Sequence, residues 1–375
     1  IIRFDAAMTL ANEHIKRLWY PTHGVGGAIP SRYDHEMTIE EFNKLMPKEF
    51  WREVVDRVEK DVPGTLLLAE AFWLMEGYFV RTLGMHRVYN SAFMHMLRDE
   101  DNDKYRTLIK NVLEYDPQIL QRFVNFMNNP DEKPAVEQFG KGDKYLGVCT
   151  LMVSMPGLPM FGHGQIEGYR EKYGMEYKKA DLDETPDEGL LKAHEWHIFP
   201  LLKQREIFAS IKNFVLYDFM NKDGTVDENV IVYSNCLEAK NKEGENRYSL
   251  IVYHNKNTHS NGYIKDAAGI GSKGNISHVN LGKALNLNKS DRQFIIYRDL
   301  ENNLEYIRSS KRIMDKGLFL RLKGYQHHAF LNFRTVEDSD GKWKKVNNDL
   351  KGKGYWSIKA RYDEMFSSSK KHKRD

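Results

Sequence analysis

The sequence is poor in cysteine, in long apolar runs and in net charge, and each shortage excludes a class of protein. Only two cysteines, Cys149 and Cys236, occur among 375 residues, which excludes a disulfide-stapled scaffold and predicts two reduced thiols. No apolar run reaches the roughly eighteen residues that a membrane-spanning helix needs, so no membrane partner is expected. The formal net charge is only +3, which excludes a strongly basic or acidic protein.

An initiator methionine and a signal-peptide pattern are also lacking, and Ile1 and Ile2 lead directly into a strand-like segment. We therefore expect the chain to be the later part of a longer polypeptide, with the upstream part as its partner. A cytoplasmic location is slightly favoured.

What the sequence does contain is enough apolar material for a large core. Hydrophobic residues make up 41% and aromatic residues 12% of the chain, which is typical of a globular protein of two or three domains. The basic residues gather at the end, where residues 342–375 hold eleven Lys and Arg against four Asp and Glu. A solvated terminal segment is favoured over a nucleic-acid contact, because no aromatic motif is interleaved with the charges.

Short apolar strands alternate with amphipathic helices over residues 1–213. The five expected strands span about residues 1–4, 65–69, 87–90, 123–127 and 158–162. Among the helices, residues 50–58 place Phe50, Val54, Val55 and Val58 on one face, and the long helix near residues 188–207 should be kinked by Pro200. This alternation predicts an α/β fold with parallel strands joined by helical crossovers.

The pattern changes at residue 214. Short runs rich in aromatic and β-branched residues, separated by Gly, Asn, Asp and Lys turns, predict an antiparallel β-sandwich or barrel over residues 214–334. Residues 335–375 lose this rhythm and are expected to form a loosely attached basic tail. The predicted organisation is therefore an α/β region, an antiparallel β-domain and a tail.

Acidic residues stand where three of the parallel strands end. Asp5 follows "IIRF", Glu70 follows "TLLLA" and Asp131 follows "RFVNFMNNP". The carboxyl ends of parallel strands in a barrel open on one face, so these groups are expected to converge. Carboxylates capping local helices would explain each residue separately, whereas three acids at one face favour catalysis.

Glycoside cleavage needs two carboxyl groups in different environments. One attacks the sugar carbon, while the other is kept protonated by an apolar setting and gives a proton to the leaving oxygen. Glu70 lies in the apolar stretch "LLLAEAFW", whereas Asp5 has Arg3 beside it on the same face of the strand. These settings predict Glu70 as the acid, with a raised pKa, and Asp5 as the ionised nucleophile.

The ordered segments "IRFDAAM", "LLLAEAFW", "FVNFMNNPDE" and "PGLPMFGHGQIEG" resemble the successive motifs of the α-amylase family, glycoside hydrolase family 13. The resemblance implies the later half of a (β/α)8 barrel over residues 1–213, the family's C-terminal β-domain over residues 214–334, and a retaining mechanism on α-linked glucose polymers or oligosaccharides. It makes Asp5 the nucleophile, Arg3 its orienting partner, Glu70 the acid/base and Asp131 the residue that holds sugar hydroxyls.

The resemblance also leaves room for a structural calcium ion, and no other cofactor is expected. Phe72, Trp73 and Asn129 are further candidate substrate contacts, the two aromatic residues as stacking platforms. Hydrolysis and glycosyl transfer share one covalent intermediate, so the motifs favour neither.

Two positions depart from the family pattern. Pro130 precedes the third acid, where the family usually has histidine, and Thr9 stands four residues after the predicted nucleophile, where histidine or a similar group is common. These departures keep open a second hypothesis, a catalytically silent carbohydrate-binding relative.

Two weaker motifs are interpreted as structural. "HEWH" at residues 194–197 contains two histidines but lacks the H-E-x-x-H spacing of a zinc protease, so no metal site is predicted from it. The glycine-rich segment at residues 23–32 lacks the Lys-Ser/Thr of a phosphate-binding loop, so a loop at the rim of the barrel is favoured.

Overall fold

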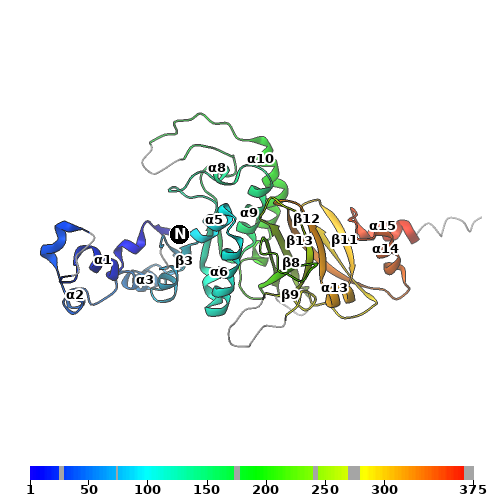
Figure 1. Ribbon diagram of the computed structural model, residues 1–375, viewed down its shortest axis with the longest axis horizontal. Helices are drawn as coiled ribbons and strands as arrows, with labels where there is room; N and C mark the ends of the chain where they lie inside the picture. The colour runs from blue at the N-terminus through cyan, green and yellow to red at the C-terminus, as the bar shows by residue number, and fades with distance from the viewer. Residues whose placement is uncertain (25–28, 73–74, 173–177, 240–243, 269–278, 367–375) are drawn as a thin grey trace, which may run out of the picture. The chain divides into compact units, whose positions relative to one another are not determined.

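The computed structural model describes residues 1–24, 29–72, 75–172, 178–239, 244–268 and 279–366 (Figure 1). These residues form two compact units. The first contains residues 1–91 and 122–124, and the second contains residues 92–121 and 125–375.

Five short strands form one sheet in the order of the sequence. They are β1 (Ile2–Phe4), β2 (Leu67–Ala69), β3 (Arg87–Tyr89), β4 (Phe123–Phe126) and β5 (Leu158–Met160). β1 pairs with β2, β2 with β3 and β3 with β4, each in parallel register. The five strands predicted from the sequence are confirmed, because runs such as Leu67–Ala69 are buried on both sides, as expected where helices cover both faces.

Four α-helices connect the strands of the first unit. They are α1 (Asn12–Trp19), α2 (Ile39–Leu45), α3 (Phe50–Asp61) and α4 (Glu76–Arg81), with 3-10 helices at Ala7–Leu10 and Pro30–His35. The buried face of α3 contains Trp51 and Val55, whereas Phe50 is 42% exposed, so the predicted face was partly wrong. Trp51 is fixed by its indole N–H, which donates to the carbonyl of Ala7 at 2.6 Å.

The second unit begins with helices that cover the later strands. They are α5 (Ser91–Asp99), α6 (Asn102–Tyr115), α7 (Pro117–Arg122), α8 (Ala135–Phe139), α9 (Asp143–Ser154), α10 (Glu188–Ala193) and α11 (Phe199–Leu202). A π-helical turn at His194–Ile198 separates α10 from α11, and a 3-10 helix follows at Arg205–Ile207. The long helix expected near residues 188–207 is thus interrupted by a π-helical turn that precedes Pro200, and Pro200 lies in the first turn of α11.

Eight strands form a second, curled antiparallel sheet. They are β6 (Val215–Asn221), β7 (Val230–Leu237), β8 (Arg247–His254), β9 (Ser260–Ala267), β10 (Gln293–Asp299), β11 (Leu304–Ser309), β12 (Leu318–Leu322) and β13 (His327–Glu337). Their order is β11-β10-β13-β8-β7-β6-β9-β12. One continuous sheet thus forms the antiparallel domain predicted after residue 214, and its core includes Phe219, Val232, Val252 and Phe330. Helices α12 (Leu281–Ala284) and α13 (Ser310–Lys316) lie beside it.

The last described residues form two helices, α14 (Lys342–Leu350) and α15 (Ile358–Phe366), which Figure 1 shows beside β11. Val346, Leu350 and Ile358 are buried in a cluster with Phe294 and Ile307 of β10 and β11. This packing differs from the loosely attached tail expected from the sequence, because apolar residues spaced along two helices cover an apolar sheet edge. β13 also continues to Glu337, past the expected boundary at residue 334.

Buried polar contacts join α6 to the antiparallel sheet within the second unit. The guanidinium of Arg106 is fully buried, contacts Asp218 and Glu228 at 2.5 Å each, and donates to the carbonyls of Tyr217 and Val230. Helix α9 also packs on β8 and β13. The helices from α6 onward therefore form one compact unit with the antiparallel sheet, and the chain does not divide at the expected boundary between residues 213 and 214.

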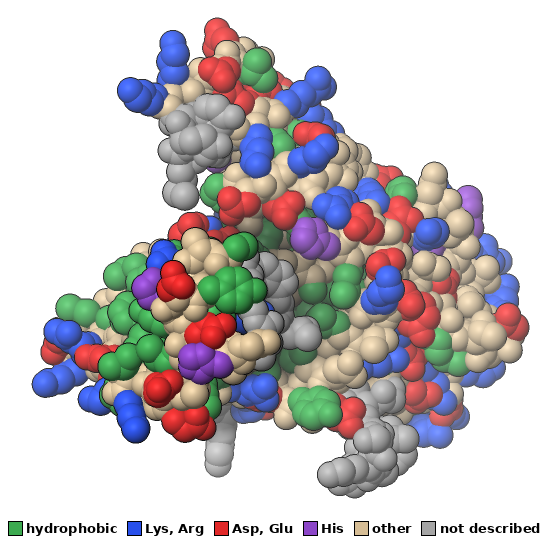
Figure 2. Space-filling view, turned by 60° about the vertical axis from the view of Figure 1, so that its left-hand side comes forward, with side chains coloured by type: hydrophobic (Ala, Val, Ile, Leu, Met, Phe, Trp, Pro, Cys, Tyr) green, Lys and Arg blue, Asp and Glu red, His purple; other side chains and the backbone are tan. Residues whose placement is uncertain are grey.

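The other general expectations concern cysteine, membrane and charge. Cys149 and Cys236 are both free thiols, as predicted. Among the described residues no helix is long and apolar enough to cross a membrane. Figure 2 shows Lys and Arg intermingled with Asp and Glu over the face in view, rather than gathered into a field of one sign.

Candidate active site

The carboxyl ends of β1, β2 and β3 place four polar side chains in one cluster, which we call the Arg3 cluster: Arg3, Asp5, Glu70 and Tyr89. The guanidinium of Arg3 reaches all three partners. Its Nη1 donates to Oδ1 of Asp5 at 2.5 Å, its Nε donates to the hydroxyl of Tyr89 at 2.8 Å, and its Nη2 lies 3.2 Å from Oε2 of Glu70. The sequence predicted the contact with Asp5, and the parallel register adds the other two.

Glu70 is held in a buried position directly after β2. Only 3% of the residue is exposed. Its backbone N–H donates to the carbonyl of Phe4 at 3.0 Å, and its Oε2 accepts from the N–H of Ala6 at 2.8 Å. Ala6 has a left-handed conformation, with φ of 42°, which costs about 1–2 kcal/mol for a residue with a Cβ. The Glu70 carboxyl thus satisfies a donor in a strained turn beside Asp5.

The two carboxyl groups of the Arg3 cluster differ in exposure. The side chain of Asp5 is 56% exposed, whereas that of Glu70 is 5% exposed. Burial lowers the pKa of Arg3, but the hydrogen bond to Asp5 and the neighbouring Tyr89 and Glu70 outweigh burial and raise it above its ordinary value. Arg3 is therefore a cation that contacts one exposed and one buried carboxyl group.

The predicted aromatic contacts follow Glu70 in the chain. Phe72 is half-buried, and its carbonyl accepts from the N–H of Met75 at 3.2 Å. Trp73 lies outside the described residues. Tyr89, which sequence reasoning did not assign to the site, is only 1% exposed and contacts Arg3. Its place at the end of β3 was the available signal for this role.

Asp131 and Asn129 belong to the second unit and lie in one turn after β4. The side-chain oxygen of Asn129 accepts from the N–H groups of Asp131 and Glu132, both at 3.0 Å. Pro130 stands at the second position of this turn, where its fixed φ is favourable. The carbonyl of Asp131 accepts from Nζ of Lys172 at 2.7 Å, and Asp131 is exposed. Asn129 thus shapes the turn that presents Asp131.

Thr9, the other position that departs from the family pattern, lies in the 3-10 helix after β1. Its hydroxyl donates to the carbonyl of Ala6 at 2.8 Å. Thr9 therefore closes the turn that follows Asp5, a local role that any Ser or Thr can take in such a turn.

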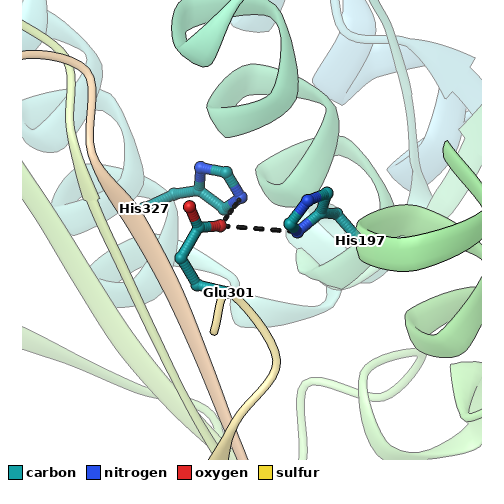
Figure 3. Close-up of side chains that lie close together, drawn as sticks. All are labelled: His197, Glu301 and His327. Atoms are coloured by element: carbon teal, nitrogen blue, oxygen red, sulfur yellow. Dashed lines mark ion pairs between the residues drawn. The ribbon is translucent and has the colours of Figure 1, made fainter. Parts of the chain in front are cut away.

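A second cluster of polar side chains lies in the second unit, and we call His197, Glu301 and His327 the His197 cluster (Figure 3). Oε2 of Glu301 lies 3.1 Å from Nε2 of His327 and 3.4 Å from Nδ1 of His197. Burial lowers the pKa of His327 to about 3, and burial also lowers that of His197. Burial, with Asp299 nearby, raises the pKa of Glu301 to about 7.

Sequence reasoning missed the His197 cluster. "HEWH" supplied one of its members, but His194 is fully buried and its Nε2 lies 2.9 Å from the hydroxyl of Tyr145. The other two members come from a turn and a strand far along the chain, and no spacing rule connects them to residue 197.

A cavity with a volume of about 880 Å³ lies in the second unit beside β10, β11 and β12. Its lining includes Tyr306, Phe319, Arg308 and Arg321, and none of the predicted catalytic residues.

Comparison of the sequence finds no matching protein-family model and no matching curated protein. Comparison of the structure finds similar enzymes of known structure. A cyclomaltodextrinase is 14% identical with a TM-score of 0.50, and the match covers 76% of this chain and 43% of that one. The α-amylase of Geobacillus thermoleovorans is 12% identical with a TM-score of 0.49, and the match covers 76% of this chain and 57% of that one. The α-amylase of Anoxybacillus is 15% identical with a TM-score of 0.47, and the match covers 75% of this chain and 55% of that one.

The chain thus spans about half the length of these structures. At such low identity the likeness concerns the fold alone. The match to the cyclomaltodextrinase, with a TM-score of 0.50, covers 76% of this chain. The chain therefore has an α-amylase-family fold.

Proposed function

We propose that this chain supplies the nucleophile and the acid/base of a retaining enzyme that cleaves or transfers α-linked glucose units of polymers or oligosaccharides. The observation that carries the proposal is the Arg3 cluster, in which one guanidinium contacts two carboxyl groups at the ends of adjacent parallel strands. A cluster of this kind at the carboxyl ends of barrel strands is where catalytic groups collect. The matched solved structure named as a cyclomaltodextrinase supports this chemistry.

In the proposed first step, a carboxylate oxygen of Asp5 attacks the anomeric carbon of the bound sugar. The glycosidic C–O bond breaks, and Glu70 gives its proton to the departing oxygen, leaving a covalent glycosyl–Asp5 intermediate. Asp5 is the better nucleophile because it is exposed and its charge is held by Arg3. Glu70 is assigned as the proton donor because it is the buried one of the two carboxyl groups.

In the second step, the Glu70 carboxylate takes a proton from water or from a sugar hydroxyl. The oxygen of that acceptor attacks the anomeric carbon and the bond to Asp5 breaks. The free enzyme is restored, and the sugar product has the same anomeric configuration as the substrate. Water gives hydrolysis and a sugar acceptor gives transfer. Asp131, presented by its turn, is proposed to hold sugar hydroxyls as the ring distorts, with Phe72 and Trp73 as stacking contacts and Asn129 as a donor.

The first test removes the nucleophile. The Asp5→Asn variant should be made in the longest polypeptide that contains these residues and assayed on maltooligosaccharides. Its turnover should fall by at least about a thousandfold, because covalent catalysis cannot proceed. Asp56→Asn is the matched control, since Asp56 pairs with Arg52 on the surface of α3 in the same unit. Unchanged turnover in Asp5→Asn would contradict the proposal.

The second test separates the two roles. Glu70→Gln should still form the intermediate from an α-glucosyl fluoride, because fluoride leaves without a proton, but should turn it over slowly. Added azide should then accelerate turnover of Glu70→Gln and give the α-glucosyl azide, whereas Asp5→Asn with azide can give only the inverted product. If both variants give the same anomer, the assigned roles are wrong.

The alternative function, a silent carbohydrate-binding relative, is favoured by Pro130 and Thr9 in place of the family's usual residues. It predicts saturable binding of maltooligosaccharides, measured by calorimetry, with no turnover in the unmutated polypeptide.

A further inference from the structure

The His197 cluster brings together three segments that are distant in the sequence. His197 comes from the π-helical turn at His194–Ile198, Glu301 follows β10, and His327 is the first residue of β13. π-helical turns are rare and are often found at functional sites. Figure 3 shows the His327 ring close above the Glu301 carboxylate and the His197 ring to its right, with one carboxylate oxygen facing both rings.

The separations between the three side chains resemble those around a tetrahedral metal ion. Zinc binds histidine nitrogen and carboxylate oxygen at about 2.0–2.1 Å, which places neighbouring ligand atoms about 3.3–3.4 Å apart. Oε2 of Glu301 lies 3.1 Å from His327 and 3.4 Å from His197. All three ligand atoms lie within 4.8 Å of one another, so only a small side-chain rotation is needed.

Hydrogen bonds do not explain why these atoms converge. Within the described part of the chain, neither Nδ1 of His197 nor Oε2 of Glu301 has a hydrogen-bond partner, although both atoms are buried. A buried polar atom without a partner costs about 1–3 kcal/mol. Two such atoms pointing at each other and at His327 are therefore better explained by a cation between them.

The surrounding charges also favour a cation. Asp143 and Asp299 both act electrostatically on His197 and on Glu301, and His328 acts on Glu301 in the opposite direction. Asp299 is fixed by Nδ1 of His328 at 2.8 Å and by the side chain of Asn302 at 3.0 Å. The side chains of the cluster range from 4% exposed at His327 to 30% at Glu301, so the site is enclosed but reachable from solvent.

We propose that His197, Glu301 and His327 bind a first-row divalent cation, with Zn²⁺ as the favoured ion and water in the fourth position. Two imidazoles and one carboxylate with an open position form a ligand set that zinc adopts in proteins. Ca²⁺ and Mg²⁺ are disfavoured because they select oxygen ligands. The ion ties the π-helical turn to two segments of the antiparallel sheet and thereby stabilises the second unit.

The experiment measures Zn²⁺ binding to tag-free chain 1–375 after removal of metals with a chelating resin. Titration against a chromophoric zinc chelator should give one bound ion per chain. Co²⁺ in its place should give the visible d–d absorption of a four- or five-coordinate site. Saturating Zn²⁺ should raise the midpoint of thermal unfolding.

Glu301→Gln is the decisive variant because it keeps the size of the side chain and removes its charge. It should weaken Zn²⁺ binding by more than about 100-fold, since even changes to residues behind the ligands cost about 10–100-fold. His197→Gln should do the same. His259→Gln is the matched control, because His259 is an exposed histidine of the same unit, and it should bind like the unmutated chain. Circular dichroism would confirm that each variant is folded.

Absence of stoichiometric Zn²⁺ and Co²⁺ binding, or equal binding by Glu301→Gln and the unmutated chain, would overturn the proposal. The measurement needs no glycosidase activity, so its failure leaves the proposed function untouched.

Discussion

The Arg3 cluster and the His197 cluster are both partly buried groups of charged and polar side chains, but their members are connected differently. In the Arg3 cluster a single guanidinium contacts both carboxyl groups and a tyrosine hydroxyl. In the His197 cluster, two of the converging atoms have no hydrogen-bond partner among the described residues. The carboxyl groups of the first cluster already have the guanidinium of Arg3 beside them. In the second cluster we expect the proposed metal ion to supply the positive charge.

Removing the guanidinium of Arg3, which contacts every other member of the Arg3 cluster, should have the largest effect on stability. Arg3→Ala takes the cation away from the buried Glu70, and breaking a buried ion pair costs about 3–5 kcal/mol. Because the side chain of Arg3 is 24% exposed, we expect Arg3→Ala to lower the free energy of unfolding, measured by urea denaturation, by about 2–4 kcal/mol. Asp5→Asn should change stability by less than about 0.5 kcal/mol, since Asp5 is 56% exposed. If Arg3→Ala and Asp5→Asn lowered the free energy of unfolding equally, Arg3 would not be the residue that stabilises the cluster.

Zinc should stabilise the unmutated chain but not a variant of the His197 cluster. At a free Zn²⁺ concentration of a hundred times Kd, binding to the folded state alone adds about 2.7 kcal/mol to the free energy of unfolding. Glu301→Gln should show almost none of this gain in the same urea titration. A similar gain in both proteins would place the ion elsewhere.

Glu100, in the second unit, is a carboxylate that has several hydrogen-bond and ion-pair partners and can be compared with Glu301. It accepts from Tyr325 at 2.6 Å and Lys144 at 2.9 Å, and lies 3.0 Å from Nζ of Lys256. Burial raises its pKa, but these three hydrogen bonds outweigh burial and lower it to about 2. Glu100→Gln should therefore cost about 1–2 kcal/mol at pH 7.

The stabilisation by the Glu100 carboxylate should depend on pH because its pKa is lower in the folded chain than in the unfolded chain. The folded pKa of Glu100 lies below the value of about 4.5 in the unfolded chain, so its contribution is complete above that pH and is lost as pH falls towards 2. The difference in unfolding free energy between the unmutated chain and Glu100→Gln should shrink over this range. A difference independent of pH would contradict the assignment.

The smallest effect is expected for Glu301→Gln in the metal-free chain. Because Oε2 of Glu301 has no hydrogen-bond partner among the described residues, little is lost, and we expect a change within about 0.5 kcal/mol. A loss of more than about 2 kcal/mol without metal would show that the cluster is held by its own ion pairs, and would remove the difference from the Arg3 cluster.

The sequence alone was sufficient for the arrangement of the parallel strands and the pairing of Arg3 with Asp5. Strand periodicity is local, so an alternating or continuous apolar run predicts a strand wherever it packs. Arg3 and Asp5 lie two residues apart, and the period of a strand places them on the same side. Glu70 could be added because parallel strands bring their carboxyl ends to one edge.

Tertiary structure decided the rest. The strand register brings Glu70 and Tyr89 to the guanidinium of Arg3, and packing against β10 and β11 orders residues 342–366, which the sequence pattern left as a tail. Most clearly, His197, Glu301 and His327 meet only because a π-helical turn lies beside the adjoining ends of β10 and β13. Local sequence patterns record the spacing of neighbours along the chain, whereas this cluster depends on contacts between segments whose separation no local periodicity fixes.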